Sequence, residues 1–206
     1  MVAPFKVPAR AFLKTQGAGL ARIPLISAEM LSPTQSEITN RMASGPRGGV
    51  RGPYKVFLHS PDLANRLDPL GVYLRYQGAV PVRLREFAIC VVAAHWRANY
   101  AWHAHANIAR RQGVSDQVLE ALQQQECPVF ENEDEDVVYK YCHELLNTGT
   151  VKDSTFNAVN RILGVRGGVD LTALVGYYSL VSFTLNAFDV SVSEGVVSAW
   201  NGSDDN

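Results

Sequence analysis

The chain has 206 residues and a mass of 22.6 kDa, enough for one domain or two small ones. Its 19 basic and 20 acidic side chains give a net charge of −1, which argues against a nucleic-acid-binding protein. With 47% hydrophobic and 19% charged residues, the composition is that of a globular chain and excludes bulk disorder.

The three cysteines and the N-terminal segment indicate where the protein works. Cys90, Cys127 and Cys142 show neither CxxC nor metal-type spacing, so a disulfide-stapled secreted domain is not expected. The opening residues, MVAPFKVPARAFLK, contain no apolar core of signal-peptide length. We therefore expect a cytoplasmic protein.

The N-terminal part predicts an extended arm, one helix and a loop. The first thirty residues are rich in Ala and Pro and show no sustained period. Ser32-Pro33 is a helix-start signal, and Gly45-Pro46 ends that helix. Residues 45–53, GPRGGVRGP, lack the strand and the GK[ST] ending of a phosphate-binding loop, which leaves a connector or a mobile active-site loop.

The remaining chain is punctuated as a series of helices, and no segment alternates with period two as a strand would. The expected helices cover residues 60–77, 82–98, 100–112, 115–125, 131–147, 153–163 and 169–188, with a break at Gly167-Gly168. These predict an all-α fold with an arm (1–52), a helical domain (53–190) and a frayed tail (191–206).

The segment from Leu171 to Phe188 carries no charged residue and is just long enough to span a bilayer. It also contains several hydroxyl and amide side chains and lacks a basic flank, so a membrane span is a poor interpretation. We expect this helix to be buried in a bundle or at a subunit contact, with no membrane partner.

Polar and aromatic residues are densest in HWRANYAWHAH, residues 95–105. On a helix, His105 shares the apolar face with Ala101 and Ile108, so burial and a shifted pKa are expected for it. On the preceding helix Glu86 also lies on an apolar face and needs a partner there. A histidine of the neighbouring helix could be that partner; alternatively Arg83 or Arg85 neutralises Glu86 as an ordinary first-turn acid.

A metal site is not expected from these histidines. His103 and His105 are separated by two positions, which on a helix directs them to different faces, unlike a pair separated by four. With Glu86 and His95 they do not form a plausible ligand set, and no cofactor is predicted.

The run PVRLREFAICVVAAHWRANYAWHAHANIARRQGVSDQVLEAL resembles the signature stretch of the carboxymuconolactone decarboxylase family, which includes the alkyl hydroperoxidase D proteins. The matching features are RxRE before an apolar helix, a Tyr and a Trp, then His105, and a Ser-Asp cap after Gly113. FLHSPDLANRL and VDLTALVGYYSLVSFTLNAFDV extend the resemblance over roughly residues 53–190. It implies a helical bundle of the alkyl hydroperoxidase D-like type that forms a homo-oligomer, usually a trimer or hexamer.

The resemblance also marks what this chain lacks. In the peroxidase branch, a glutamate and a histidine correspond to Glu86 and His105, but the two CxxC cysteines fall on Ala98 and Ala101. Alanine forms no thiolate, which rules out that thiol–disulfide reaction. A second glutamate found in other relatives, in Tyr-Glu-Trp-x-x-His, is replaced here by the alanine of Tyr-Ala-Trp-His-Ala-His. The three cysteines are expected to be small buried hydrophobic residues, Cys90 being the one near the site.

The catalytic candidates are therefore acid–base residues without a nucleophile: Glu86, Tyr100, His103 and His105. They suit a cofactor-free reaction such as decarboxylation of a lactone acid or a related small cyclic carboxylate from aromatic-compound metabolism, as the family name implies. In this hypothesis His105 donates a proton, Glu86 orients it, and Tyr100 or His103 donates a hydrogen bond to the developing oxyanion.

Candidate substrate-binding residues are Arg47 and Arg51, which could hold a carboxylate, together with Arg97, Trp102 and Tyr178; Tyr177 and Asn186 could also line a pocket. Two other functions remain open. The first is a non-thiol oxidoreductase acting on peroxides or quinones, and the second is an inactive member of the family that binds a ligand.

Overall fold

The computed structural model describes residues 21–192 and 198–200, and within them it contains helices and no strands, as expected for an all-α fold. The elements in order are η2 (Ala28–Met30), α1 (Pro33–Ser44), α2 (Tyr54–Phe57), α3 (Pro61–Val72), η3 (Tyr73–Gln77), α4 (Val82–His95), α5 (Asn99–Arg111), α6 (Asp116–Gln123), α7 (Glu133–Thr148) and α8 (Asp153–Ala187).

Local capping explains why several predicted helix starts are confirmed. The Ser32 hydroxyl accepts a hydrogen bond from the Gln35 amide, and the Gln35 side chain accepts one from the Ser32 amide, which makes a capping box at α1. Ser115 accepts in the same way from the Val118 amide at α6. The four-residue helix α2 was not predicted.

The long closing helix differs from the prediction in the position of its break. The backbone leaves helical geometry at Gly164, with φ 69° and ψ 170°, and not at Gly167-Gly168. The left-handed φ of Gly164 is readily available to glycine. Gly167 is buried and helical, and a Cβ there would lie 2.6 Å from the Leu163 Cβ, so this glycine serves close packing.

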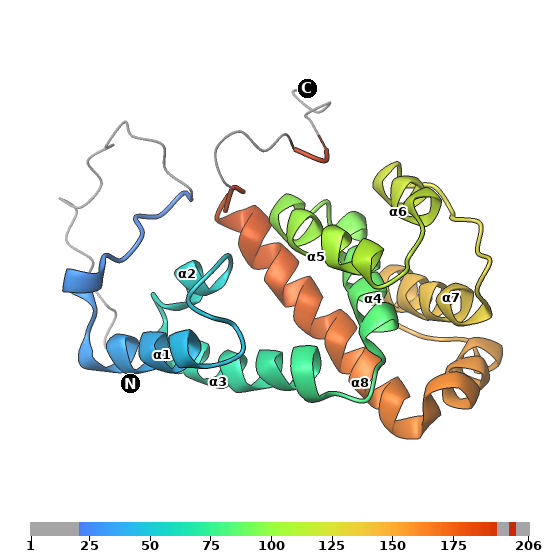
Figure 1. Cartoon of the computed structure of the whole chain (residues 1–206), viewed down its shortest axis with the longest axis horizontal. Helices are drawn as coiled ribbons and strands as arrows, with labels where there is room; N and C mark the ends of the chain where they lie inside the picture. The colour runs from blue at the N-terminus through green and yellow to red at the C-terminus, as the bar shows by residue number, and fades with distance from the viewer. Residues whose placement is uncertain (1–20, 193–197, 201–206) are drawn as a thin grey trace.

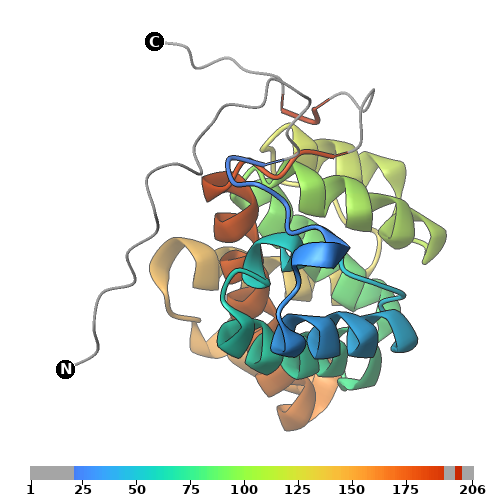
Figure 2. The same cartoon turned by 90° about the vertical axis from the view of Figure 1, so that its left-hand side faces the viewer.

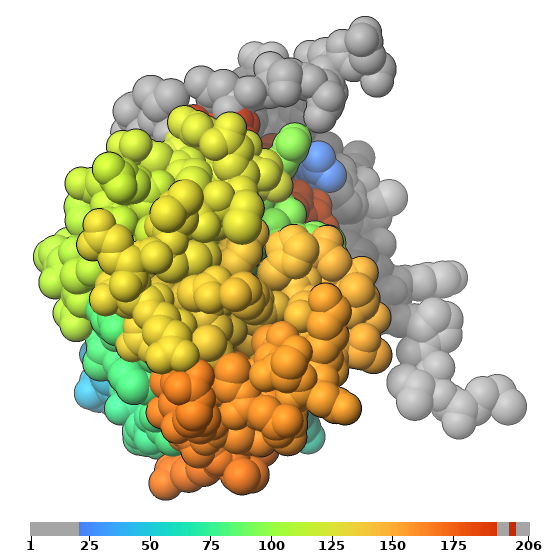
Figure 3. Space-filling view, turned by 90° about the vertical axis from the view of Figure 1, so that its right-hand side faces the viewer, coloured from blue at the N-terminus to red at the C-terminus, as the bar shows by residue number. Residues whose placement is uncertain are grey.

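The core is built around α4, which is buried on all sides from Leu84 to Ala94 because it contacts α5, α6, α7 and α8. In Figure 1, α8 crosses the molecule between α1–α3 on one side and α4–α7 on the other. Figure 2 faces the side formed by α1, α2 and α3, and Figure 3 faces the opposite side, formed largely by α6, α7 and the first part of α8. The inner face of α8 is thereby brought against both groups of helices.

Both ends of the described chain are attached to this bundle. The Arg22 amide donates to the Phe188 carbonyl at 2.7 Å; residues 1–20 of the predicted N-terminal arm lie outside the described residues. Near the C-terminus, the Trp200 indole N–H donates to the Gln123 carbonyl at 2.8 Å, and its ring packs 5.3 Å from that of Trp102. The prediction of a frayed tail is therefore wrong for residues 198–200; the rest of the tail beyond Val192 lies outside the described residues.

By length and composition, α8 is the one described helix that could cross a membrane. About 61% of its most apolar window is buried inside the fold, as in the core helix of a globular protein. This burial fits the expected packing of the helix within a bundle.

Candidate active site

Glu86 and His105 form a buried pair between α4 and α5. His105 Nδ1 lies 2.6 Å from Glu86 Oε2, and the histidine and the glutamate are 6% and 2% exposed. Each residue lies on the apolar face of its helix, and the packing of α4 against α5 brings those faces together. With Nδ1–H donating to the carboxylate, Nε2 of the neutral ring is left with its lone pair directed away from Glu86.

Burial and charge act differently on the two groups. Burial raises the pKa of Glu86, but the hydrogen bond and charge of His105, together with Arg75 and Arg85, lower that pKa below its usual value. Burial lowers the pKa of His105; Glu86 opposes this, whereas Arg75 and Arg85 add to it, and the net pKa is lowered. The resting pair is therefore a carboxylate and a neutral imidazole at neutral pH.

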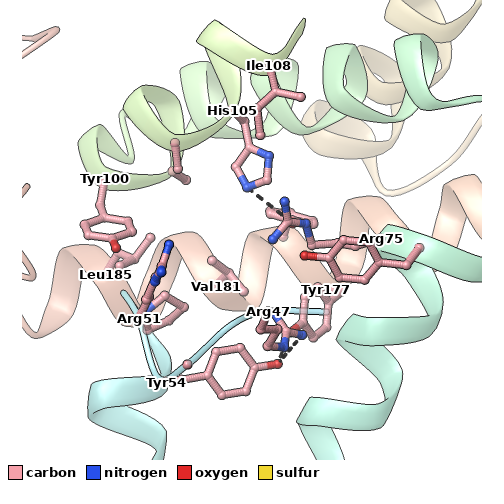
Figure 4. A pocket seen from close by; sticks show the side chains of 16 residues that line it. Arg47, Arg51, Tyr54, Arg75, Tyr100, His105, Ile108, Tyr177, Val181 and Leu185 are labelled. Carbon is pink, nitrogen blue, oxygen red and sulfur yellow. Dashed lines mark hydrogen bonds between the residues drawn. The ribbon is translucent and has the colours of Figure 1, made fainter. Parts of the chain in front are cut away.

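His105 opens onto a cavity of about 390 Å³ that is enclosed by α5, α8, η3 and the loop before α2 (Figure 4). The polar part of its lining consists of His105, three arginines and five tyrosines: Arg47, Arg51, Arg75, Tyr54, Tyr76, Tyr100, Tyr177 and Tyr178. Apolar side chains such as Ile108, Val181 and Leu185 complete the walls. A cavity of this size with convergent polar groups and partly apolar walls is typical of a small-molecule site.

The loop of residues 45–53 forms one wall, where Arg47 is firmly anchored. Its Nε donates to Asp68 at 2.8 Å and its Nη2 donates to the Tyr54 hydroxyl at 2.8 Å, while its guanidinium lies 4.3 Å from the Tyr54 ring centroid. The Tyr54 and Tyr177 hydroxyls are 2.6 Å apart. Because Arg47 is held in an ion pair with Asp68, which also pairs with Arg41, this arginine chiefly shapes the wall.

Arg51 and Arg75 are differently placed. Among the described residues, neither forms an ion pair with a carboxylate, and Arg75 Nε is buried without a hydrogen-bond partner. Arg75 comes from η3, a π-helical turn that ends the α3 segment, and its guanidinium points into the cavity (Figure 4). Two guanidinium groups that line a cavity and form no ion pair with a carboxylate can bind an anion. Arg75 was missed because helical periodicity does not predict a π-helical turn.

Tyr100 and Tyr178 provide hydroxyl groups at the same cavity. The Tyr178 hydroxyl lies 3.4 Å from His105 Nε2. Burial raises the pKa of both tyrosines, so each hydroxyl keeps its proton and remains a hydrogen-bond donor.

The structure does not bring the other predicted residues to this cavity. His103 and Trp102 line a separate depression of about 340 Å³ with Asn107 and Arg110. Arg97 is exposed in the turn between α4 and α5, where its φ is 48°. The reason is the helical rotation of α5, which turns positions 102 and 103 away from the face that carries Ala101 and His105.

The cysteines also differ in part from the expectation. Cys90 and Cys142 are buried, as expected, but Cys127 is exposed, and all three are free thiols. Burial raises the pKa of Cys90 well above its usual range, which suppresses thiolate formation there. Within the described part of the chain, no three His, Cys, Asp or Glu side chains are grouped to hold a metal ion.

Comparison of the sequence with protein families finds that residues 61–133 match the carboxymuconolactone decarboxylase family. The matched segment includes Arg75, Glu86 and His105. No curated protein matches the chain in sequence.

Several solved structures share the fold. A peroxidase-related protein from Ralstonia eutropha JMP134, described as an alkylhydroperoxidase AhpD core, has a TM-score of 0.70 at 14% identity, covering 86% of this chain and 95% of that one. A peroxidase-related protein from Silicibacter sp. TM1040 has a TM-score of 0.68 at 16% identity, covering 88% and 96%. A cysteine-to-alanine variant of the debrominase Bmp8, in complex with 2,3,4-tribromopyrrole, has a TM-score of 0.58 at 13% identity, covering 84% and 94%. At these identities the likeness shows the fold alone.

Proposed function

We propose that this chain, which carries the sequence match to the carboxymuconolactone decarboxylase family, is a cofactor-free lyase that removes CO₂ from a lactone acid or a related small cyclic carboxylate. The observation that supports this best is the orientation of His105. Its Nδ1 is held by buried Glu86, while its other nitrogen faces a cavity with Arg51 and Arg75. That arrangement transfers protons near a bound anion and contains no nucleophile.

In the proposed reaction, the bond between the ring carbon and the departing carboxylate breaks, and its electron pair moves into the lactone to give a dienolate. Tyr178 or Tyr100 donates a hydrogen bond to the enolate oxygen. Protonated His105 gives its Nε2 proton to carbon and is reprotonated from solvent, while the Glu86 carboxylate stabilises the imidazolium. All atoms and charges balance when one proton is consumed for each CO₂ released.

The arginines are best assigned to binding a part of the substrate that keeps or gains negative charge during the reaction. Binding the departing carboxylate tightly would stabilise the ground state more than the transition state and slow the reaction. We therefore assign Arg51 and Arg75 to a second anionic group of the substrate or to the developing enolate oxygen. Arg47 supports the wall through Asp68 and Tyr54.

The test is turnover of a panel of unsaturated lactone acids in D₂O, followed by CO₂ release and by deuterium incorporation at carbon. We expect one deuterium in each product molecule, no effect of a chelator or a thiol-blocking reagent, and at least about a 100-fold loss in the variant His105→Asn. Normal turnover by His105→Asn would overturn the proposal.

Dependence on a reductant would instead favour an oxidoreductase acting on peroxides or quinones. Ligand-dependent stabilisation without turnover would favour an inactive ligand-binding protein.

We also propose that the protein forms a homo-oligomer through the outer face of α8. Val165, Val169, Leu180 and Phe183 lie along one stripe of this helix and are 38–71% exposed. The four positions fall on one side of the helix, away from the cavity-lining Tyr178 and Val181. Between Val169 and Leu180 this side carries the smaller exposed residues Thr172, Ala173 and Gly176. A second copy of this stripe would bury it.

A further inference from the structure

Arg75 is held close to the buried pair by an unusual backbone element. The α3 segment ends in the π-helical turn Tyr73–Gln77, and Leu74 of this turn is buried in the core. The Arg75 guanidinium lies 5.1 Å from the Tyr76 ring centroid, and both side chains line the cavity next to His105. The anchored turn therefore fixes a positive charge beside the imidazole.

The charged and hydrogen-bonding groups around His105 come from every element packed against it. The first, Glu86 on α4, is a direct hydrogen-bond partner, and Arg85 follows it with its Nε 3.8 Å from Glu86 Oε1. The second is Arg75 on η3, and the third is the Tyr178 hydroxyl on α8. The other groups that line the cavity are Arg47, Arg51, Tyr54, Tyr76, Tyr100 and Tyr177. One carboxylate in contact with the ring is thus opposed by two nearby guanidinium groups.

Of these guanidinium groups, Arg75 is the one that both lines the cavity and lowers the pKa of His105. Arg47 is held in an ion pair with Asp68, which it shares with Arg41, and the side chain of Arg85 is only 9% exposed. Arg51 is exposed in the loop of residues 45–53, and its charge lowers the pKa of Tyr100. An anion that enters the cavity can therefore neutralise Arg75 without displacing an existing carboxylate.

We infer that Arg75 is a positioning residue that adds to the effect of burial in keeping His105 neutral in the empty site, and that an anionic ligand held at Arg75 offsets this charge and causes His105 to take up a proton from solvent. The proton donor required by the proposed reaction would then exist only in the complex. This inference depends on the proposed site and deepens it, since it makes substrate charge the signal that prepares the acid. Nearby charges affect the pKa of His105 strongly because the imidazole ring is buried and has little contact with water.

The inference can be tested without turnover. Benzoate serves as the probe because it is a planar carboxylate that the proposed reaction cannot decarboxylate, and benzamide is its neutral control. Titration of the His105 ring by NMR, assigned among the five histidines through loss of its signal in His105→Asn, reads its protonation directly. We expect saturating benzoate to raise the pKa of His105 by about one unit and benzamide to leave it unchanged.

Variants separate the electrostatic role from a structural one. In Arg75→Gln, we expect the pKa of His105 to be higher without ligand and to rise less with benzoate, because the anion is no longer held beside the ring. Arg75→Lys keeps the charge and should preserve the low pKa and part of the response. Arg51→Gln should weaken benzoate binding while leaving the ligand-free pKa of His105 as in the wild type.

Calorimetry in two buffers of different ionisation enthalpy gives a second measurement, because binding linked to protonation draws protons from the buffer. We expect benzoate binding to take up a fraction of a proton in the wild type and in Arg75→Lys, and a smaller fraction in Arg75→Gln. A benzoate response as large in Arg75→Gln as in the wild type, or a pKa of His105 that does not change with benzoate in the wild type, would overturn the inference. These results do not depend on whether the protein decarboxylates any lactone acid.

Discussion

Tyr178 meets the ring of His105 edge to face, with ring centroids 5.2 Å apart, an interplanar angle of 87° and its hydroxyl 3.4 Å from Nε2. These two residues come from α8 and α5, and they meet at the wall of the main cavity. The contact holds the imidazole on the side opposite Glu86 and places a protonated hydroxyl where the substrate would bind.

Replacement of Tyr178 with Phe should separate catalysis from stability. The ring contact with His105 stays, whereas the hydroxyl that would donate to the enolate oxygen is lost. We expect kcat to fall by about 10- to 1000-fold, and the free energy of unfolding to change by less than about 1 kcal/mol, because the hydroxyl makes only a long hydrogen bond. Steady-state kinetics and urea unfolding of the same preparation would measure both; an unchanged kcat would remove Tyr178 from the mechanism.

Glu86→Gln should move the pH dependence of activity in a defined direction. Glu86 raises the proton affinity of His105 through its hydrogen bond and its charge, so a neutral amide lowers the pKa of His105 further. If His105 acts as the proton donor, kcat/KM falls as pH rises through its pKa, which in the wild type lies below the usual 6.5. The falling limb should therefore shift to lower pH in Glu86→Gln. A shift to higher pH would contradict the assigned role.

Gly71→Ala should be destabilising because α3 has no room for a side chain at this position. A Cβ at Gly71 would overlap both Arg47 Nη2 and the Tyr177 hydroxyl oxygen. We expect a loss of about 1–3 kcal/mol in the free energy of unfolding, with weaker ligand binding as the Arg47–Tyr54 wall shifts.

Gly176→Ala in α8 is the matched control, because within one copy of the chain nothing lies within 4 Å of its added Cβ; both glycine variants are compared at a concentration at which the chain is monomeric. Helix propensity alone predicts that it stabilises by about 0.5–1 kcal/mol. Equal effects of the two variants would contradict the packing argument.

Trp200 should contribute measurably to stability although its partners Trp102 and Gln123 are distant in sequence. Trp200→Ala removes the ring contact with Trp102 and the hydrogen bond to the Gln123 carbonyl, and we expect a loss of about 1–3 kcal/mol. Trp200→Phe keeps an aromatic ring and should lose less. Thermal unfolding of both variants would check this order, and a melting temperature unchanged in Trp200→Ala would show that the attachment contributes nothing.

Charges on the apolar stripe of α8 should disrupt self-association. Phe183→Lys and Val169→Lys place a charge at positions that are 49% and 62% exposed in one copy of the chain. If a second copy covers this stripe, light scattering after size-exclusion chromatography should show a smaller mass for either variant. Val129→Lys, at a site that is 89% exposed and outside α8, is the control and should leave the mass unchanged.

The sequence by itself determined the helical class and most helix boundaries. The signals at Ser32-Pro33, Ser115 and Gly113 act within three or four residues, so they are readable without knowing what the helices pack against. Helical periodicity also placed Glu86 and His105 on apolar faces, which is why their burial could be predicted.

Other features depend on contacts between distant parts of the chain, and only the tertiary structure decided them. The break at Gly164 could not be distinguished from one at Gly167-Gly168, because packing and not propensity decides which glycine leaves the helix. Arg47, in the loop of residues 45–53, finds its charge partner in Asp68 of α3, and Arg75 enters the cavity from a π-helical turn. Likewise, His103 and His105 share one short segment, yet the packing of α5 against α4 and α8 leaves only His105 at the cavity.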